Sequence, residues 1–187
     1  MSAMNLNDFR NYVQQFKGCG LNRIYLHWSA GRYTNIEDAY HISIGKDGDI
    51  NVMHPLDKVL AATWKRNTGS VAVSMMCCFD AVCYSRSNVD FGSEPPTMAQ
   101  IEAMSKVVCI LCEELGLEMS ARDVLTHSEV ADIDGYGVGG SDPDMRWDLL
   151  LLPDSDGVLK PGGDVIRGKA IWYHYHPDAL ERRLAPF

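Results

Sequence analysis

The sequence predicts a single α/β domain over residues 1–187, with a mixed central β-sheet of about five or six strands flanked by helices. Two observations predict this class. Short apolar segments typical of strands are interspersed with segments whose apolar residues recur at helical spacing. An Asp-Gly turn between two strand-like segments indicates an antiparallel hairpin, which makes the sheet mixed. The length suits one domain with a hydrophobic core, and no linker separates a second domain.

Composition excludes several classes of protein. Hydrophobic residues make up 46% and charged residues 22% of the chain, which is typical of a globular protein. A net charge of −8 argues against nucleic acid as the main partner, because phosphate binding needs a basic surface. No apolar segment is long enough to span a bilayer, so we expect no stable membrane insertion. The N-terminus, MSAMNLNDFRNYVQQF, lacks the apolar segment of a signal peptide, which favours synthesis in a cytoplasm with reduced cysteines.

The first half of the chain predicts a helix, a strand and a hairpin. Residues 6–16 carry apolar side chains at helical spacing, and glycines follow them. Residues 23–28 (RIYLHW) form an aromatic and branched strand, with His27 near its end. Residues 40–45 and 49–53 flank a Lys-Asp-Gly turn and predict a hairpin.

The middle of the chain predicts a buried strand and a long helix. The apolar segment 71–78 is typical of a central strand. Residues 83–96 read as a polar loop, and 97–116 as a helix that begins at a threonine and ends at a glycine. Cys109 and Cys112 lie one turn apart in this helix, without a second pair at zinc-ribbon spacing, so we expect them to pack in the core.

The last part of the chain is less regular. Residues 123–127 (DVLTH) predict a short strand, and 149–152 a short apolar helix or turn. Residues 153–187 show no clear periodicity and are expected to be a C-terminal extension of the domain.

Residues 126–148, THSEVADIDGYGVGGSDPDMRWD, contain a candidate metal site. If His27 and His127 end neighbouring strands and Asp142 returns from the glycine-rich turn, they would supply three ligands and leave a fourth position open, as in catalytic zinc sites. Each residue also has an ordinary structural interpretation. A single histidine beside a strand is more often structural, Asp-Pro often begins a turn, and glycine-rich segments are often simply loops. Spacing alone does not choose between these interpretations.

Four segments between residues 23 and 148 together carry a family resemblance. They are LHWSAG, AYHISIGKDGDI, WKRNTGSVAVS, and THSEVA followed by SDPDMRWD. The sequence resembles the zinc-dependent N-acetylmuramoyl-L-alanine amidases of the type 2 amidase family. That family includes phage endolysin-like amidases and the peptidoglycan recognition proteins.

The resemblance implies roles for individual residues. One zinc ion per chain would be held by His27, His127 and Asp142. Tyr40 would be catalytic, stabilising charge near the metal-bound water. Three residues of one loop would bind substrate: Asn67, Trp64 and Arg66. Two carboxylates, Asp148 and Glu129, would hold the loops around the metal.

Two positions depart from the family pattern. Many members carry a lysine or histidine two residues before the third ligand, where this chain has Gly140. Others carry a glutamate on the central strand, where this chain has Ser74. The resemblance therefore assigns no partner to Tyr40 in stabilising the tetrahedral intermediate, and Asp144 and Glu129 are candidates.

The expected function is hydrolysis of the amide between N-acetylmuramic acid and L-alanine by zinc-activated water. A phage-type lysin fits best, made without a signal peptide and reaching the cell wall by a holin-type route. One alternative is a cytoplasmic amidase that recycles soluble muropeptides. Another is a peptidoglycan-binding module without catalysis. The expected partners are peptidoglycan or muropeptides, and the sequence specifies no oligomeric state.

Overall fold

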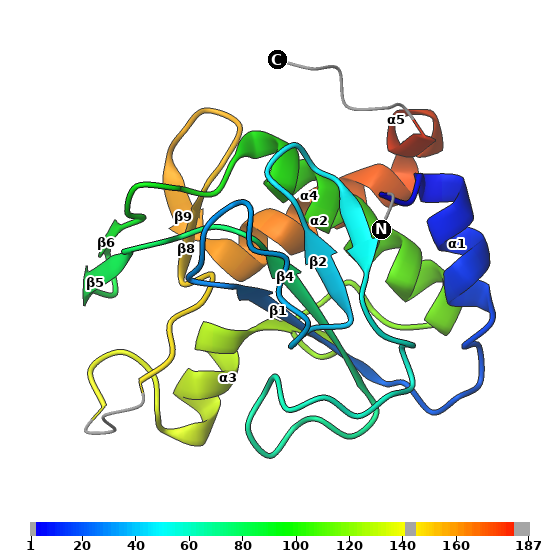
Figure 1. The fold of residues 1–187 in the computed structure, drawn as a ribbon, viewed down its shortest axis with the longest axis horizontal. Helices are drawn as coiled ribbons and strands as arrows, with labels where there is room; N and C mark the ends of the chain where they lie inside the picture. Colours follow the sequence, from blue (N-terminus) through cyan, green and yellow to red (C-terminus); the bar gives the residue numbers. More distant parts are fainter. Residues whose placement is uncertain (1–2, 141–144, 182–187) are drawn as a thin grey trace.

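A five-stranded sheet forms the centre of the computed structural model, which describes residues 3–140 and 145–181 (Figure 1). The strand order is β3-β2-β4-β1-β7. β3 is antiparallel to β2, whereas the other neighbouring pairs are parallel, which confirms the predicted mixed sheet. The strands are β1 (Arg23–Trp28), β2 (Ile42–Ile44), β3 (Ile50–Val52), β4 (Ser70–Met75) and β7 (Val124–Thr126).

Alternation along β1 separates the two faces of the sheet. Ile24, Leu26 and Trp28 join the main hydrophobic core, together with residues of helices α1 (Leu6–Gln14), α2 (Met98–Leu115) and α4 (Gly162–Tyr175). Tyr25 joins a smaller cluster with residues of β7 and α3 (His127–Asp134). His27 has the same parity as Tyr25, so it lies on the face that α3 partly covers.

Local signals in the sequence explain where α2 begins and ends. The Thr97 hydroxyl accepts a hydrogen bond from the Gln100 backbone N–H, and the Gln100 side chain accepts one from the Thr97 N–H. Gly116 ends the helix in the left-handed conformation, with φ of 72°. This confirms the helix predicted over 97–116. Cys109 and Cys112 are buried in the main core, as expected.

One expectation about the loops is wrong, and a second is only partly met. The polar segment 83–96 contains part of a hairpin formed by β5 (Val82–Ser85) and β6 (Asn88–Asp90). Burial of Val89 and an ion pair from Arg86 to Asp132 of α3 hold this hairpin against the domain. The segment 149–152, expected as a short helix or turn, begins in a turn closed by the Leu150 N–H and the Trp147 oxygen. It then continues into β8 (Leu151–Pro153), which pairs with β9 (Leu159–Pro161).

The C-terminal segment contributes to the core. Figure 1 shows α4 beside α2, and Val165, Ile166, Ala170 and Tyr173 of α4 are buried there. The chain then forms the short helix α5 (Pro177–Glu181). Within the described ranges, no helix combines the length and the apolar character needed to cross a membrane.

Candidate metal centre

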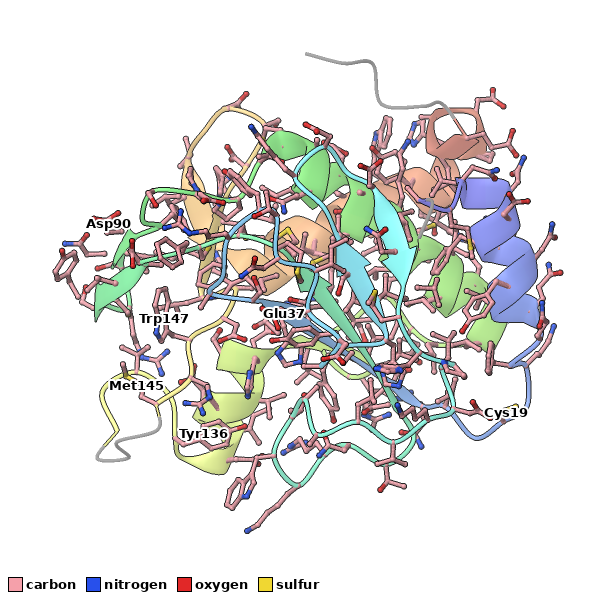
Figure 2. The ribbon with its side chains drawn as sticks, in the orientation of Figure 1. Cys19, Glu37, Asp90, Tyr136, Met145 and Trp147 are labelled. Atoms are coloured by element: carbon pink, nitrogen blue, oxygen red, sulfur yellow. The ribbon has the colours of Figure 1, made fainter. Side chains whose placement is uncertain are left out.

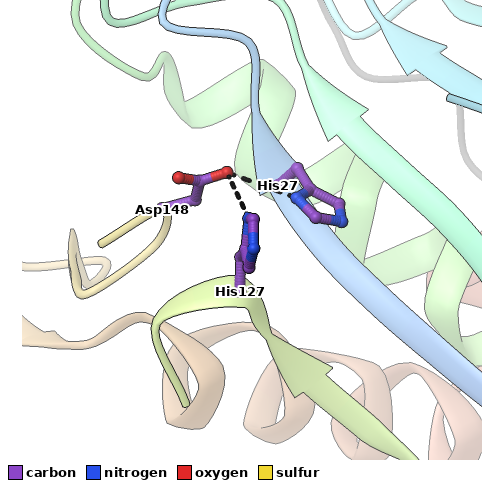
Figure 3. Close-up of side chains that lie close together, drawn as sticks. All are labelled: His27, His127 and Asp148. Atoms are coloured by element: carbon purple, nitrogen blue, oxygen red, sulfur yellow. Dashed lines mark hydrogen bonds and ion pairs between the residues drawn. The ribbon is translucent and has the colours of Figure 1, made fainter. Parts of the chain in front are cut away.

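His27 and His127 meet at one edge of the sheet. His27 lies near the carboxyl end of β1, and His127 directly follows the neighbouring parallel strand β7. The carboxyl ends of parallel strands face the same edge, which is where α/β sheets commonly bind ligands. The two imidazole rings lie with their centroids 4.7 Å apart (Figure 3).

The start of α3 places His127. The Thr126 hydroxyl accepts a hydrogen bond from the Glu129 N–H, and the Glu129 carboxylate accepts one from the Thr126 N–H at 2.8 Å. Arg167 of α4 donates two further hydrogen bonds to Glu129, at 2.8 and 2.9 Å. Glu129 therefore holds the helix start that carries His127, with its carboxylate oxygens bound to Thr126 and Arg167.

Asp148 brings a carboxylate to both histidines. Its Oδ2 atom lies 3.2 Å from Nδ1 of His27 and 3.2 Å from Nδ1 of His127 (Figure 3). Its backbone oxygen accepts a hydrogen bond from the Ser128 N–H, which fixes this segment against the start of α3. Burial disfavours the charged carboxylate, but the hydrogen bonds with His127 and His27 outweigh it and hold the pKa of Asp148 below its ordinary value.

The second nitrogen of His27 also has a partner. Nε2 lies 3.2 Å from the hydroxyl of Thr63, a residue that is 1% exposed. Burial lowers the pKa of His27, which favours the neutral imidazole. The neutral ring is the form that offers a lone pair to a metal.

The geometry of these donors suits zinc. One ligand atom from each of His27, His127 and Asp148 can be chosen so that all lie within 4.8 Å of one another. Tetrahedral zinc ligands, each about 2.0–2.2 Å from the ion, are about 3.3–3.6 Å apart. The two nitrogen–oxygen distances of 3.2 Å are close to that spacing. Two imidazoles and one carboxylate also match the ligand types of catalytic zinc sites, which keep a fourth position open.

Asp142, expected as the third ligand, and Asp144 lie outside the described residues. Asp148, expected to hold the loop, occupies a ligand-like position among the residues that are described. Gly140 donates its backbone N–H to the Gly137 oxygen and brings no charged group to its position.

Tyr40 lies beside His27, with the ring centroids 5.1 Å apart. Burial, together with the negative charge of Asp148, raises the pKa of Tyr40 to about 12. The phenol therefore keeps its proton at neutral pH and can donate a hydrogen bond. The Ser74 side chain, in place of a family glutamate, lowers the pKa of Tyr40 slightly against these two effects.

Two adjoining hollows open at the centre. One, of about 450 Å³, is lined by residues that include Trp64, Asn67, His127 and Tyr136. The other, of about 350 Å³, reaches Tyr40 and Asp148. His127 borders both hollows, so a bound molecule can extend to either side of the histidines.

The residues expected to bind substrate have different environments. Trp64 is 58% exposed and lines the larger hollow. Asn67 also lines it, although its side-chain oxygen accepts a hydrogen bond from the Thr63 N–H at 2.8 Å. Arg66 instead makes two hydrogen bonds to Asp134 of α3, at 2.6 and 2.7 Å, and so anchors the loop.

Thr63 and Tyr136 were not singled out from the sequence. Tyr136 is 5% exposed, and its hydroxyl has no hydrogen-bond partner among the described residues. Its ring lies 6.1 Å from that of His127 and 5.8 Å from that of Trp64, measured between centroids. Figure 2 shows Tyr136, Met145 and Trp147 on the same side of the molecule, near α3. An aromatic residue between Gly135 and Gly137 is the one signal that could have marked Tyr136.

The family model described as N-acetylmuramoyl-L-alanine amidase (Amidase_2) matches residues 13–144. The chain therefore belongs to this amidase family, which confirms the resemblance found in its motifs. No curated protein matches the sequence.

Solved structures of the following proteins are similar to this chain. An endolysin amidase, LysCS of Clostridium intestinale, is 16% identical, with 65% of this chain and 76% of that chain covered and a TM-score of 0.46. An endolysin of a Thermus scotoductus bacteriophage is 16% identical, with coverages of 67% and 81% and a TM-score of 0.45. Wild-type Drosophila PGRP-LB is 16% identical, with coverages of 82% and 82% and a TM-score of 0.46.

Proposed function

We propose that this protein is a zinc-dependent amidase that hydrolyses the bond between N-acetylmuramic acid and L-alanine in peptidoglycan. One observation carries the proposal. In a chain of the amidase family, His27, His127 and Asp148 bring two imidazoles and a carboxylate together at the edge of the sheet. This group matches a catalytic zinc site in ligand type, and its nitrogen–oxygen distances are close to those between tetrahedral zinc ligands.

The proposed zinc ligands are His27, His127 and one aspartate. Asp148 is the aspartate that the described geometry favours, and Asp142 is the one that the family resemblance implies. A bound zinc ion lowers the pKa of water to about 7 and polarises a carbonyl group, which is the chemistry that amide hydrolysis needs.

Tyr40 is the hydrogen-bond donor that we assign to the reaction. Its high pKa keeps the phenol protonated, so it can donate to the carbonyl oxygen of the scissile amide as negative charge develops there. Donors of this kind contribute most when they are held in place before the reaction. Packing of its ring against His27 holds Tyr40.

The hollows on either side of His127 would bind the parts of the substrate that flank the amide. Trp64 offers an exposed aromatic surface in the larger hollow, suited to packing against the apolar face of a sugar or a peptide side chain. Asn67 can offer its amide N–H groups there, since the described contact uses its oxygen. We propose polymeric peptidoglycan as the substrate, as for a phage-type lysin.

Purified protein incubated with peptidoglycan sacculi, and separately with soluble muropeptides, tests this function. We expect mass spectrometry to find stem peptides that begin with a free L-alanine amino group, and their release should stop with a chelator and resume when zinc is restored. Faster release from soluble muropeptides than from sacculi would favour a recycling amidase. Binding to sacculi without any release, in protein that contains one zinc ion per chain, would contradict the amidase and favour a binding module.

A further inference from the structure

The side chain of His27 is held from both ends of its ring. Nδ1 lies 3.2 Å from Oδ2 of Asp148, and Nε2 lies 3.2 Å from the hydroxyl of Thr63. His27 and Thr63 are each 1% exposed, so bulk water cannot easily replace the contact between them. The proton on this ring therefore depends on its two protein partners.

The two partners differ in the hydrogen bonds that they can make. A carboxylate only accepts, so the Asp148 contact in metal-free protein requires the proton on Nδ1. Nε2 then carries the lone pair, and the Thr63 hydroxyl donates to it. Metal binding through Nδ1 requires the opposite tautomer, with the proton on Nε2. The Thr63 hydroxyl then accepts, because a hydroxyl group can act in either direction.

We propose that Thr63 is a positioning residue for His27, whose hydroxyl hydrogen-bonds Nε2 in both tautomers. The ring thus keeps its orientation whichever of its two nitrogens carries the proton. This inference rests on the proposed zinc site and adds a residue that the family motifs did not mark. Partners outside the ligand shell commonly fix the tautomer and orientation of a metal-binding histidine.

The backbone around Thr63 is fixed by several contacts. The Thr63 oxygen accepts from the Arg66 N–H at 3.0 Å, and the Thr63 N–H donates to the Asn67 side chain at 2.8 Å. Lys65 within this turn has a φ of 58°, a left-handed conformation that is uncommon outside glycine and asparagine. Such residues persist where the surrounding contacts hold them.

The same turn is tied to the other histidine. Arg66 is bound to Asp134 at the end of α3, and His127 is the first residue of that helix. The segment from Thr63 to Asn67 therefore positions His27 directly and is anchored to the helix that carries His127. The turn therefore supports the proposed metal centre in addition to lining the larger hollow.

Three substitutions at one position test the inference. Thr63→Val keeps the shape of the side chain but removes the hydroxyl, Thr63→Ser keeps the hydroxyl, and Thr63→Ala is a second variant without it in case valine prevents folding. Circular dichroism establishes that each variant is folded. Zinc affinity is then measured by competition with a chelating dye, and the protonated ring nitrogen of His27 by ¹⁵N NMR.

We expect the valine and alanine variants to bind zinc about 10–100-fold more weakly than the wild type. The serine variant should bind close to the wild type. In the wild type, the ring proton should lie on Nδ1 without zinc and on Nε2 with zinc. Zinc affinity and tautomers that are unchanged in folded Thr63→Val would overturn the inference.

These experiments also distinguish an error in the Thr63 inference from an error in the proposed function. If wild-type protein binds no zinc, the proposed metal centre is wrong whatever Thr63 does. NMR of the metal-free protein still tests the hydrogen bond between Thr63 and Nε2 of His27, since loss of the Thr63 hydroxyl should shift the Nε2 resonance. An unchanged Nε2 resonance in Thr63→Val and Thr63→Ala would reject the hydrogen bond itself.

Discussion

The rings of His27 and His127 lie with their centroids 4.7 Å apart, and both rings direct Nδ1 at the same oxygen of Asp148. The contact joins the end of β1, the start of α3 and the segment that leads into β8. A carboxylate oxygen shared by two imidazole nitrogens is a suitable arrangement for a divalent cation.

The first prediction concerns the third ligand. Asp148→Asn should lower bound zinc well below one ion per chain, because a neutral amide is a much weaker ligand than a carboxylate. Asp142→Asn is the matched control, with the same chemical change in the same return segment. Elemental analysis by mass spectrometry measures zinc per chain in both. Loss of zinc only in Asp142→Asn would show that the aspartate implied by the resemblance is the ligand.

The second prediction concerns Tyr40. Tyr40→Phe should retain zinc and lower kcat by about 100–1,000-fold, the usual effect of removing one donor to a developing oxyanion. Tyr84→Phe, at an exposed tyrosine in β5, is the control and should have wild-type kinetics. Release of stem peptides from muropeptides gives the rates. A Tyr40→Phe enzyme with a wild-type kcat would remove Tyr40 from the reaction.

The third prediction concerns pH and the stability of the metal-free protein. Burial lowers the pKa of His27 and of His41 relative to the unfolded chain. Between each folded pKa and the ordinary value of about 6.5, the unfolded state binds more protons. The free energy of unfolding should therefore fall as the pH is lowered through about 6.5.

Urea denaturation with a chelator present, at several pH values on both sides of 6.5, measures this dependence. His41→Gln is a useful comparison, because it removes one of the two titrating groups and should reduce the slope. A free energy of unfolding that is constant or rises as the pH falls would contradict the buried, neutral histidines.

The fourth prediction concerns the hydroxyl of Tyr136. It is buried without a hydrogen-bond partner among the described residues, so Tyr136→Phe should leave the free energy of unfolding unchanged or raise it by about 1 kcal/mol. Tyr173→Phe is the matched control, because the Tyr173 hydroxyl hydrogen-bonds Glu102, and its removal should cost about 1–3 kcal/mol. Chemical denaturation at one pH compares them. Equal destabilisation by both substitutions would mean that Tyr136 has a partner in solution.

Much of the fold could be predicted because local patterns agree with tertiary packing. The capping residues Thr97 and Gly116 marked the ends of α2, and the Asp-Gly turn marked the hairpin of β2 and β3. The helix α4 was missed because Gly162, Gly163 and Gly168 weaken its helical pattern. At Gly162 a side chain would have its Cβ 2.2 Å from the Leu149 oxygen, so close packing explains a glycine that propensity disfavours.

The candidate site likewise has residues that the sequence pointed to and residues whose part in it only the tertiary structure shows. Strand patterns placed His27 and His127 near strand ends, but only the family resemblance implied roles for them and for Tyr40, and these roles stay predictions. The structure brings the three side chains together. Spacing could not rank Asp142 against Asp148, because both follow the same glycine-rich segment, and the choice of Asp142 rested on the resemblance alone. Thr63 carries no motif at all. The position of Asp148 depends on the hydrogen bond from the Ser128 N–H, and the role of Thr63 on its contact with His27. Both contacts join residues far apart in the sequence, so they form only when distant segments pack together.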